Sequence, residues 1–288
     1  MFSICYQGRI VEYHRPAVMG IINATPDSFF AGARVASAAD AARRARVMLD
    51  SGADMLDIGA CSTRPGSQAP DAAEEWERLQ PVLEAVREAV GSDAVISVDT
   101  FRAGVARRAV EAGLANVVND VSGGSLDPDM IPAVAALRVP YVLTHMRGTP
   151  ATMQQFTDYG PDGVAAVVLR ELAAVLDRLT LAGVADVIVD PGFGFAKTLA
   201  QNYELLAALP AFAEALGRPI LAGMSRKSMV TRLLGVPTDD ALAGTVARNM
   251  AALERGASIL RVHDVAEAAA VVKIFDTLKN PSACPTLE

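Results

Sequence analysis

Eight short apolar segments recur along the sequence, and each leads into a stretch with the periodicity of an amphipathic helix. The segments cover residues 17–22, 55–58, 95–98, 117–118, 141–143, 187–189, 220–224 and 259–260. This alternation predicts parallel strands, and right-handed crossovers place the carboxyl ends of all the strands on one side of the sheet. Nearly every segment ends at a polar residue, so we expect these residues to meet at one rim.

The alternation is compatible with two α/β folds, a TIM (β/α)8 barrel and an open doubly wound sheet. The barrel is favoured because there are eight units rather than five or six, and because polar residues follow strands all along the chain. Such a barrel commonly occupies about 250 residues as one unit. With 288 residues and no linker, we expect a single domain over 1–288, with its core at about 16–279 and two peripheral ends.

The composition limits the partners of the chain. Hydrophobic residues make up 51% of it, but charged residues interrupt every long apolar stretch, so no membrane span is expected. Residues 1–16 lack the apolar core of a signal peptide, which indicates a cytoplasmic protein. The net charge of -7 without a basic stripe argues against nucleic acid. Three widely spaced cysteines without a CxxC motif are expected to be free thiols.

Three loops carry residues suited to an anion. Residues 62–66 (Ser-Thr-Arg-Pro-Gly) follow the second strand, 225–228 (Ser-Arg-Lys-Ser) follow the seventh, and 261–263 (Arg-Val-His) follow the eighth. In β/α barrels the loops after the seventh and eighth strands commonly hold phosphate, assisted by backbone amides at a helix start. We therefore expect a phosphate site. Solvated surface charges would give the same residues, and Arg226 also fits a structural role.

A second set, Asp99, Asn119 and Asp190, follows three other strands toward the same rim. Carboxylates and amides so placed would bind the ring N–H groups and exocyclic amine of a planar heterocycle, and Lys227 could bind its ring carbonyl. The alternative for Asp99 is a helix cap. Two further loops, at 23–30 and 190–195, supply aromatic residues and glycines that suit a flat ligand but also an ordinary turn.

Several common reaction types lack their motifs in this sequence. It contains no serine protease triad pattern, HExxH, GxxxxGK[ST] or GxGxxG, which argues against those nucleophile, zinc, P-loop and dinucleotide sites. The three histidines, His14, His145 and His263, do not suggest a three-histidine metal site. We interpret His145 as a packed or hydrogen-bonded histidine that supports the site from behind.

Taken together, these segments resemble dihydropteroate synthase, a family of folate biosynthesis. The similarity lies in residues 19–29, 62–66, 96–100, 119–121, 145–148, 190–195, 223–228 and 261–264, in the family's order. The resemblance covers nearly the whole chain. It implies a transferase that condenses 6-hydroxymethyl-7,8-dihydropterin pyrophosphate with 4-aminobenzoate to give 7,8-dihydropteroate and pyrophosphate, with Mg²⁺ as cofactor. It also implies a sulfonamide target and a homodimer.

The resemblance assigns roles by position. It implies a pterin pocket formed by Asp99, Asn119, Met146, Asp190, Phe195, Gly223, Lys227 and Arg261. It implies that pyrophosphate is held by Asn23, Thr63, Arg64, Arg261 and His263, with the Asn23 carbonyl as a magnesium ligand. It implies a 4-aminobenzoate site shaped by Phe29, Thr63, Pro65 and Ser225. The residues expected to act in the reaction itself are Asp99, Arg64, Lys227, Arg261 and His263.

These residue types agree with a dissociative mechanism. Arginine, histidine and a hard cation would stabilise pyrophosphate as it leaves, and Asp99 could stabilise the resulting pterin cation. An arylamine is neutral at pH 7, so its attack depends on positioning more than on a strong base. The absence of an evident acid and base pair is therefore expected.

The chain departs from the family pattern at three places. Ala31 lies in a segment that commonly reads Ser-Asp-Gly-Gly, Cys61 replaces a common glutamate, and Ala196 replaces a common glycine. The first two lie in loops that would close over substrate, so the departures bear on loop closure and sulfonamide sensitivity.

Two other functions remain open at this point. A methyltetrahydrofolate-dependent methyltransferase would use a similar pterin-reading barrel, but it would leave the pyrophosphate residues without a purpose. A catalytically silent pterin-binding paralogue is suggested only by the changes at Cys61 and Ala31, and the retained charged rim argues against it.

Overall fold

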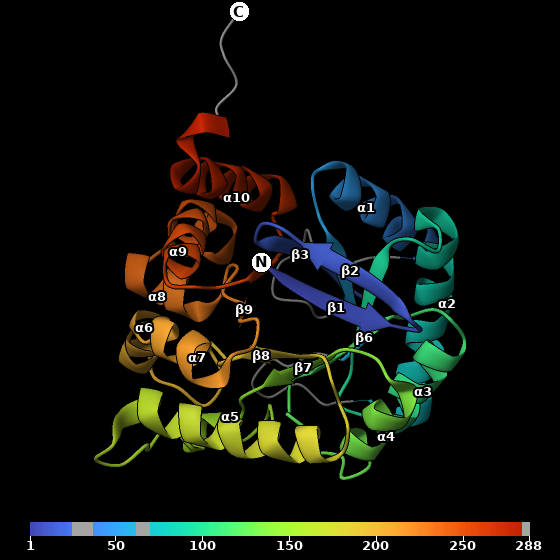
Figure 1. Ribbon diagram of the computed structural model, residues 1–288, viewed down its shortest axis with the longest axis horizontal. Helices are drawn as coiled ribbons and strands as arrows, with labels where there is room; N and C mark the ends of the chain where they lie inside the picture. Colours follow the sequence, from blue (N-terminus) through green and yellow to red (C-terminus); the bar gives the residue numbers. More distant parts are fainter. Residues whose placement is uncertain (25–36, 62–69, 284–288) are drawn as a thin grey trace, which may run out of the picture.

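The structure is a computed structural model and describes residues 1–24, 37–61 and 70–283. Eight parallel strands lie in the order β8-β7-β6-β5-β4-β3-β10-β9. They are β3 (Ala17–Asn23), β4 (Met55–Gly59), β5 (Val95–Asp99), β6 (Val117–Asp120), β7 (Tyr141–Thr144), β8 (Val187–Asp190), β9 (Leu221–Ala222) and β10 (Ile259–Val262). A parallel bridge between Val189 and Ile220 joins the first strand of this order to the last and closes the sheet. The predicted TIM barrel is confirmed (Figure 1).

Helices surround the barrel on its outside (Figure 1). They are α1 (Ala38–Asp50), α2 (Ala72–Val90), α3 (Ala103–Glu111), α4 (Met130–Leu137), α5 (Gly163–Leu181), α6 (Leu199–Ala207), α7 (Leu209–Leu216), α8 (Ser228–Leu234), α9 (Leu242–Glu254) and α10 (Val265–Lys279). Short 3₁₀ turns lie at η2 (Met153–Gln155), η3 (Thr238–Asp240) and η4 (Pro281–Ala283). Side chains of Ser37, Asp71 and Thr198 accept backbone N–H bonds at three helix starts, which fixes where those helices begin.

The register of the barrel aligns the polar strand ends. Asn23 pairs with Gly59, Gly59 with Asp99, and Asp99 with Asn119, so four consecutive strands end at one level. A Cβ atom at Gly59 would lie 3.0 Å from the Cβ of Asp99 and 3.2 Å from its carbonyl oxygen. The glycine therefore leaves the space in which Asp99 sits at the rim.

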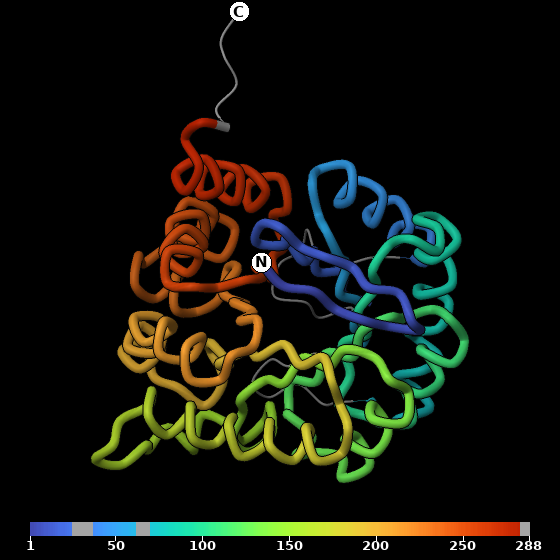
Figure 2. Tube along the Cα trace, in the orientation of Figure 1, coloured from blue at the N-terminus to red at the C-terminus, as the bar shows by residue number. Residues whose placement is uncertain are grey.

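The first 15 residues are not peripheral, contrary to expectation. They form a hairpin of β1 (Phe2–Tyr6) and β2 (Arg9–Tyr13) that crosses the end of the barrel, as the blue tube of Figure 2 shows. The side chains of Ile4, Tyr6 and Tyr13, on the inner face of this hairpin, are buried. The hairpin covers the amino ends of the strands, because the Cys5 N–H donates to Asp186 (3.2 Å), just before β8.

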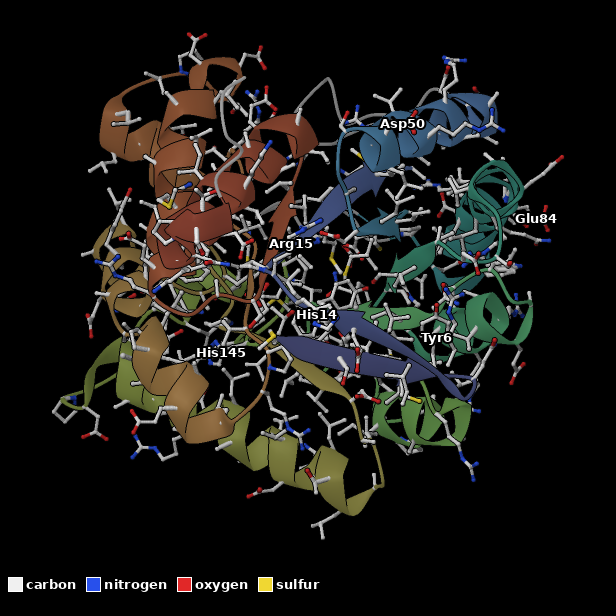
Figure 3. The ribbon with its side chains drawn as sticks, turned by 45° about the horizontal axis from the view of Figure 1, so that its top comes forward. Tyr6, His14, Arg15, Asp50, Glu84 and His145 are labelled. Atoms are coloured by element: carbon white, nitrogen blue, oxygen red, sulfur yellow. The ribbon has the colours of Figure 1, made fainter. Side chains whose placement is uncertain are left out.

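The same end is fastened at the entry to β3, where Arg15 donates to both carboxylate oxygens of Asp54 at 2.9 and 3.0 Å. Figure 3 labels Tyr6 on the hairpin and Arg15 at this entry. The apolar core of the barrel is therefore closed from below, and the opposite end is left for a ligand. Among the described residues, no helix is long and apolar enough to cross a membrane.

Candidate active site

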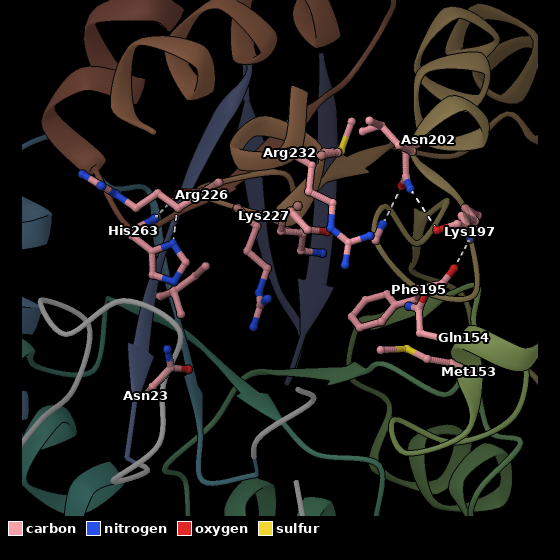
Figure 4. A pocket seen from close by; sticks show the side chains of 18 of the residues that line it. Asn23, Met153, Gln154, Phe195, Lys197, Asn202, Arg226, Lys227, Arg232 and His263 are labelled. Atoms are coloured by element: carbon pink, nitrogen blue, oxygen red, sulfur yellow. Dashed lines mark hydrogen bonds between the residues drawn. The ribbon is translucent and has the colours of Figure 1, made fainter. Parts of the chain in front are cut away.

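A cavity of about 350 Å³ opens among the loops at the carboxyl ends of the strands. Figure 4 shows Lys227 pointing into it, between His263 on one side and Phe195 on the other. The cavity is lined by Ile21, Asn23, Cys61, Asp99, Met153, Gln154, Gly194, Phe195, Lys197, Leu199, Asn202, Gly223, Ser225, Arg226, Lys227, Ser228, Met229, Arg232, Arg261 and His263. It joins residues from the first strand of the barrel to the last.

The structure brings together most of the residues predicted for the site. Those lining the cavity are Asn23, Asp99, Phe195, Gly223, Ser225, Lys227, Arg261 and His263. Asn119, Met146 and Asp190 are buried behind this lining. Phe29, Thr63, Arg64 and Pro65, as well as the departure at Ala31, lie outside the described residues.

Arg261 crosses the barrel mouth and joins two carboxylates. Its Nε donates to Asp57 Oδ2 at 2.6 Å, and its Nη2 donates to Asp99 Oδ2 at 2.5 Å. Asp57 also accepts from the side-chain amide of Asn119 at 3.0 Å. Four residues from four strands therefore form one polar cluster, in which Asp57 and Asn119 are buried and Asp99 and Arg261 line the cavity.

This cluster sets the charge of its members. Burial raises the pKa of Asp99 to about 7, and Asp57 adds to that rise, whereas Arg261 beside it opposes the rise. Burial would lower the pKa of Arg261, but the carboxylates of Asp57 and Asp99 outweigh it and raise that pKa. Arg261 is therefore charged at every working pH, while Asp99 can gain or lose a proton near neutrality.

Asp190 is held at the end of β8 by the loop that follows it. The Gly192 N–H donates to Asp190 Oδ1 at 2.8 Å. Gly192 has a φ of 76°, and a Cβ atom there would lie 1.9 Å from the carbonyl oxygen of His145, so only glycine fits. Burial raises the pKa of Asp190 above its ordinary value, although the nearby Lys227 opposes this rise.

Lys227 lines the cavity next to the loop 190–196. Its Nζ donates to the Phe193 carbonyl at 2.6 Å and lies 4.5 Å from the centre of the Phe195 ring. Burial lowers the pKa of Lys227 to about 8, although Asp190 opposes this. Phe195 lines the cavity as expected of an aromatic wall, whereas Phe193 is fully buried in the barrel core.

His263 and Ser225 form the side of the cavity nearest Asn23. Ser225 Oγ accepts the backbone N–H of His263 at 3.2 Å and lies 3.0 Å from its Nδ1. Burial lowers the pKa of His263 to about 3, and the nearby cations Arg261, Arg44, Arg226 and Lys227 lower it further. His263 is therefore a neutral hydrogen-bonding group in the ligand-free protein.

Arg226 has a structural role, one of the two interpretations left open above. Its Nε and Nη2 donate to the two carboxylate oxygens of Asp264, each at 2.9 Å, and its Nη1 donates to the carbonyls of Thr238 and Asp239. Arg226 also has a φ of 53°. It therefore joins the loop before α8 to the start of α10 and shapes the turn that aims Lys227.

Two departures from the family pattern have physical consequences. Cys61 lines the cavity, and Arg102 Nη1 lies 3.6 Å from its sulfur while also pairing with the buried Glu75. Burial raises the pKa of the Cys61 thiol to about 11, so it is protonated. Ala196 has a φ of 50°, a conformation that favours glycine, and its methyl group packs in the small core cluster of Met146 and Met153.

Sequence reasoning missed two buried charged groups at the site. Asp57 is fully buried. The signal for it was a single carboxylate inside the apolar segment 55–58. Lys197 lines the cavity and is buried, although lysine is usually exposed. His145 is buried, as expected, and forms hydrogen bonds with Glu171 through Nε2 and with Lys197 through Nδ1.

The chain was compared with protein families and with known structures. The family of pterin-binding enzymes matches residues 19–263. The dihydropteroate synthase of Synechocystis sp. is 42% identical over 92% of this chain and 90% of its own length.

Two solved structures share the fold. The dihydropteroate synthase of Yersinia pestis, in complex with a sulfonamide drug, superposes with a TM-score of 0.90 at 38% identity, over 96% of this chain and 99% of the other. That of Xanthomonas albilineans, solved with 4-aminobenzoic acid, gives a TM-score of 0.85 at 40% identity over 98% and 99% of the two chains. Barrel, site and sequence thus agree, and the chain belongs to the dihydropteroate synthase family of pterin-binding enzymes.

Proposed function

We propose that this transferase condenses 6-hydroxymethyl-7,8-dihydropterin pyrophosphate with 4-aminobenzoate in folate biosynthesis, and that the cavity at the barrel mouth is where both substrates bind. The observation that carries the proposal is the charge pattern of the cavity. Asp99, Lys227, Arg261 and His263 line the cavity, and the acceptors of Asp57, Asn119 and Asp190 lie buried behind this lining. A ligand that is a planar donor at one end and an anion at the other fits this pattern.

The pterin ring would bind beside the buried acceptors. Asp190 and Asn119 offer acceptors for its ring N–H groups and exocyclic amine, and Lys227 offers a donor for its ring carbonyl. Phe195 would cover one face of the ring. A Cβ atom at Gly223 would lie 3.4 Å from Asp190 Oδ2, so the glycine keeps this edge of the pocket open.

The pyrophosphate would bind toward Asn23 and His263. The His263 imidazole is neutral and can donate one hydrogen bond, so the charge of the anion must be met mainly by Arg261 and by Arg64. Among the residues that the structure describes, no group of three acidic, histidine or cysteine side chains could hold a metal by itself. The Asn23 carbonyl, an oxygen donor of the kind that Mg²⁺ prefers, lies in the cavity lining and would hold Mg²⁺ bound to the pyrophosphate. When bound, that ion would neutralise charge on the leaving group.

The chemical step would proceed through a pterin cation. As the bond from carbon to pyrophosphate lengthens, positive charge develops in the pterin ring, and the Asp99 carboxylate lies at the cavity wall where it could stabilise that charge. The neutral amine of 4-aminobenzoate then attacks the pterin carbon, and one amine proton leaves to water or to the released pyrophosphate. Ser225, with Phe29, Thr63 and Pro65, would orient the amine for attack.

Two further properties are part of the proposal. Leu233 and Leu234 on α8 and Ile274 and Leu278 on α10 are exposed, and both helices pack against α9. Exposed apolar side chains of this kind would suit a homodimer, which light scattering after gel filtration would measure. We also infer a cytoplasmic location, because both substrates are small soluble metabolites.

The proposed function is tested by measuring pyrophosphate release with each component omitted in turn. Release is expected only when both substrates and Mg²⁺ are present, with one dihydropteroate formed per pyrophosphate. Methyl transfer to a corrinoid without any pyrophosphate release would instead establish the methyltransferase. Pterin binding without turnover would establish the binding-only paralogue.

A further inference from the structure

Lys197 is a buried ammonium group that the reaction outlined above does not use. It follows the loop 190–196 and lies beneath it, lining the cavity (Figure 4). Its Nζ donates to the carbonyl oxygens of Gly192 and Phe195, both at 2.9 Å, and lies 3.1 Å from Nδ1 of His145. An ammonium has three N–H donors. These three contacts use all of them.

The contact with His145 fixes the tautomer of that histidine. An ammonium can only donate, so Nδ1 of His145 is the acceptor and its ring proton is on Nε2. Nε2 then donates to Glu171 Oε2 at 2.8 Å. Burial lowers the pKa of His145 to about 4, which agrees with a neutral ring. The imidazole therefore joins Lys197 to the α5 carboxylate in one defined orientation.

The network extends from Glu171 back to the same loop. Arg147 pairs with Glu171 at 2.5 Å and lies 4.3 Å over the ring of Tyr159. The Tyr159 hydroxyl donates to the Ala196 carbonyl at 3.0 Å. The loop 190–196 is thus held at three carbonyls from below, by Lys197 at two of them and by Tyr159 at the third.

This loop carries two groups that form the proposed pterin pocket. Asp190 stands at its start, and its backbone carbonyl accepts the N–H of His145 at 3.0 Å. Phe195 stands near its end. Because Lys197 bonds the carbonyls of Gly192 and Phe195, it sets the separation between the carboxylate that would read the ring edge and the aromatic ring that would cover its face.

We propose that Lys197, oriented by His145 and Glu171, is a positioning residue that holds Asp190 and Phe195 in the geometry required to bind the pterin. The inference rests on the proposed function and assigns Lys197 no contact with the reacting atoms. Loss of its three bonds would let the loop relax, so the pterin site would weaken while the site for the arylamine would be little changed.

The charge of Lys197 predicts a pH dependence of pterin binding that a purely structural residue would not cause. Burial lowers the pKa of Lys197 to about 7. The charged groups facing it are Asp190 on β8, Lys227 before α8, Glu171 on α5 and Arg147 after β7. A neutral amine has two N–H donors and a lone pair, so it cannot satisfy three acceptors. Pterin affinity is therefore expected to fall as the pH rises above about 7.

The experiment measures the dissociation constant of 6-hydroxymethyl-7,8-dihydropterin pyrophosphate by calorimetry from pH 6 to 9. Three proteins are compared: the wild type, Lys197→Met, and the control Lys273→Met, which changes an exposed lysine on α10. Lys197→Met is expected to raise the dissociation constant at least tenfold at pH 6.5, to change the KM for 4-aminobenzoate less than twofold, and to lose the fall in affinity around pH 7. Lys273→Met should match the wild type.

Equal pterin affinity in the wild type and a folded Lys197→Met would overturn the inference while leaving the proposed function intact. A wild type that binds no pterin would overturn both. If Lys197→Met does not fold, Glu171→Gln decides, because Glu171 is partly exposed and its charge raises the pKa of Lys197. In Glu171→Gln, the pH at which half of the pterin affinity is lost should be lower than in the wild type. An unchanged pH would overturn the inference.

Discussion

Arg261 and Asp99 are joined across the barrel mouth by a hydrogen bond of 2.5 Å, although their strands, β10 and β5, are separated by β3 and β4 in the sheet. The same guanidinium is held from below by the fully buried Asp57. One cation thus pairs with two carboxylates at the cavity. This arrangement keeps Asp99 near its ionisation point and aims Arg261 at the cavity before any substrate arrives.

Asp57 is expected to contribute to stability through this cluster. Asp57→Ala removes the acceptor of both Arg261 and the Asn119 amide, and breaking a buried ion pair typically costs about 3–5 kcal/mol. We expect the free energy of unfolding in urea to fall by about 3 kcal/mol, at the lower end because Asp99 remains as a partner. The control is Asp93→Ala, whose carboxylate pairs with Arg9 on the surface and should cost about 1 kcal/mol or less. Equal losses in the two variants would contradict the account.

Asp190→Asn is expected to weaken pterin binding severely. The change removes a charge and replaces an acceptor with a donor that faces ring N–H groups, and a hydrogen bond to a charged group is worth about 1.5–3 kcal/mol. The dissociation constant for the pterin substrate should rise at least tenfold in titration calorimetry, whereas Asp177→Asn on the exposed side of α5 should leave it unchanged. Unaltered affinity in Asp190→Asn would remove this residue from the pterin pocket.

Arg261→Ala is expected to impair pyrophosphate binding more than arylamine binding. The variant loses a cation that stays charged at every working pH, and it leaves Asp57 and Asp99 without their shared partner. Inhibition by added pyrophosphate should weaken at least tenfold, with a smaller change in the KM for 4-aminobenzoate. Arg170→Ala, which breaks an exposed ion pair with Asp162, is the matched control. A larger effect on 4-aminobenzoate than on pyrophosphate would contradict the assignment.

The activity is expected to show a narrow pH optimum. Asp99 stabilises a cation only as a carboxylate, and burial raises its pKa to about 7, so kcat/KM should fall as the pH drops below 7. Lys227 donates most strongly when charged, and burial lowers its pKa to about 8, so its deprotonation adds to the loss of pterin affinity that Lys197 is expected to cause above about pH 7. A pH-rate profile of wild type and Asp99→Asn checks this, because the variant should be slower and should lack the acidic limb. An acidic limb that survives in Asp99→Asn belongs to another group.

The strand ends could be predicted from sequence because burial on both faces makes each strand a short apolar run that stops at the rim. That pattern located Asn23, Asp99, Asn119, Asp190 and Arg261 without any coordinates. The strand β9 ends at Ala222 and is shorter than the apolar run 220–224, and a turn at Ser225 and Arg226 leads to Lys227.

Other features required the structure. The opening hairpin has charged residues on its exposed face, and only the tertiary fold shows that Ile4 and Tyr13 cap the barrel. Lys197 resembles any surface lysine in sequence, because two of its three partners are backbone carbonyls, which leave no trace in residue type. Asp57 depends in the same way on Arg261, which lies 204 residues away along the chain.

In the proposed mechanism, the bond to pyrophosphate breaks to give a pterin cation before the arylamine attacks. The most direct test labels the oxygen that joins the pterin carbon to pyrophosphate with ¹⁸O and follows its position in unreacted substrate, with enzyme and Mg²⁺ but no 4-aminobenzoate. A dissociative mechanism requires that the label scrambles into the non-bridging positions of the attached phosphate. A label that stays in place, in an enzyme that forms dihydropteroate normally once 4-aminobenzoate is added, would contradict it.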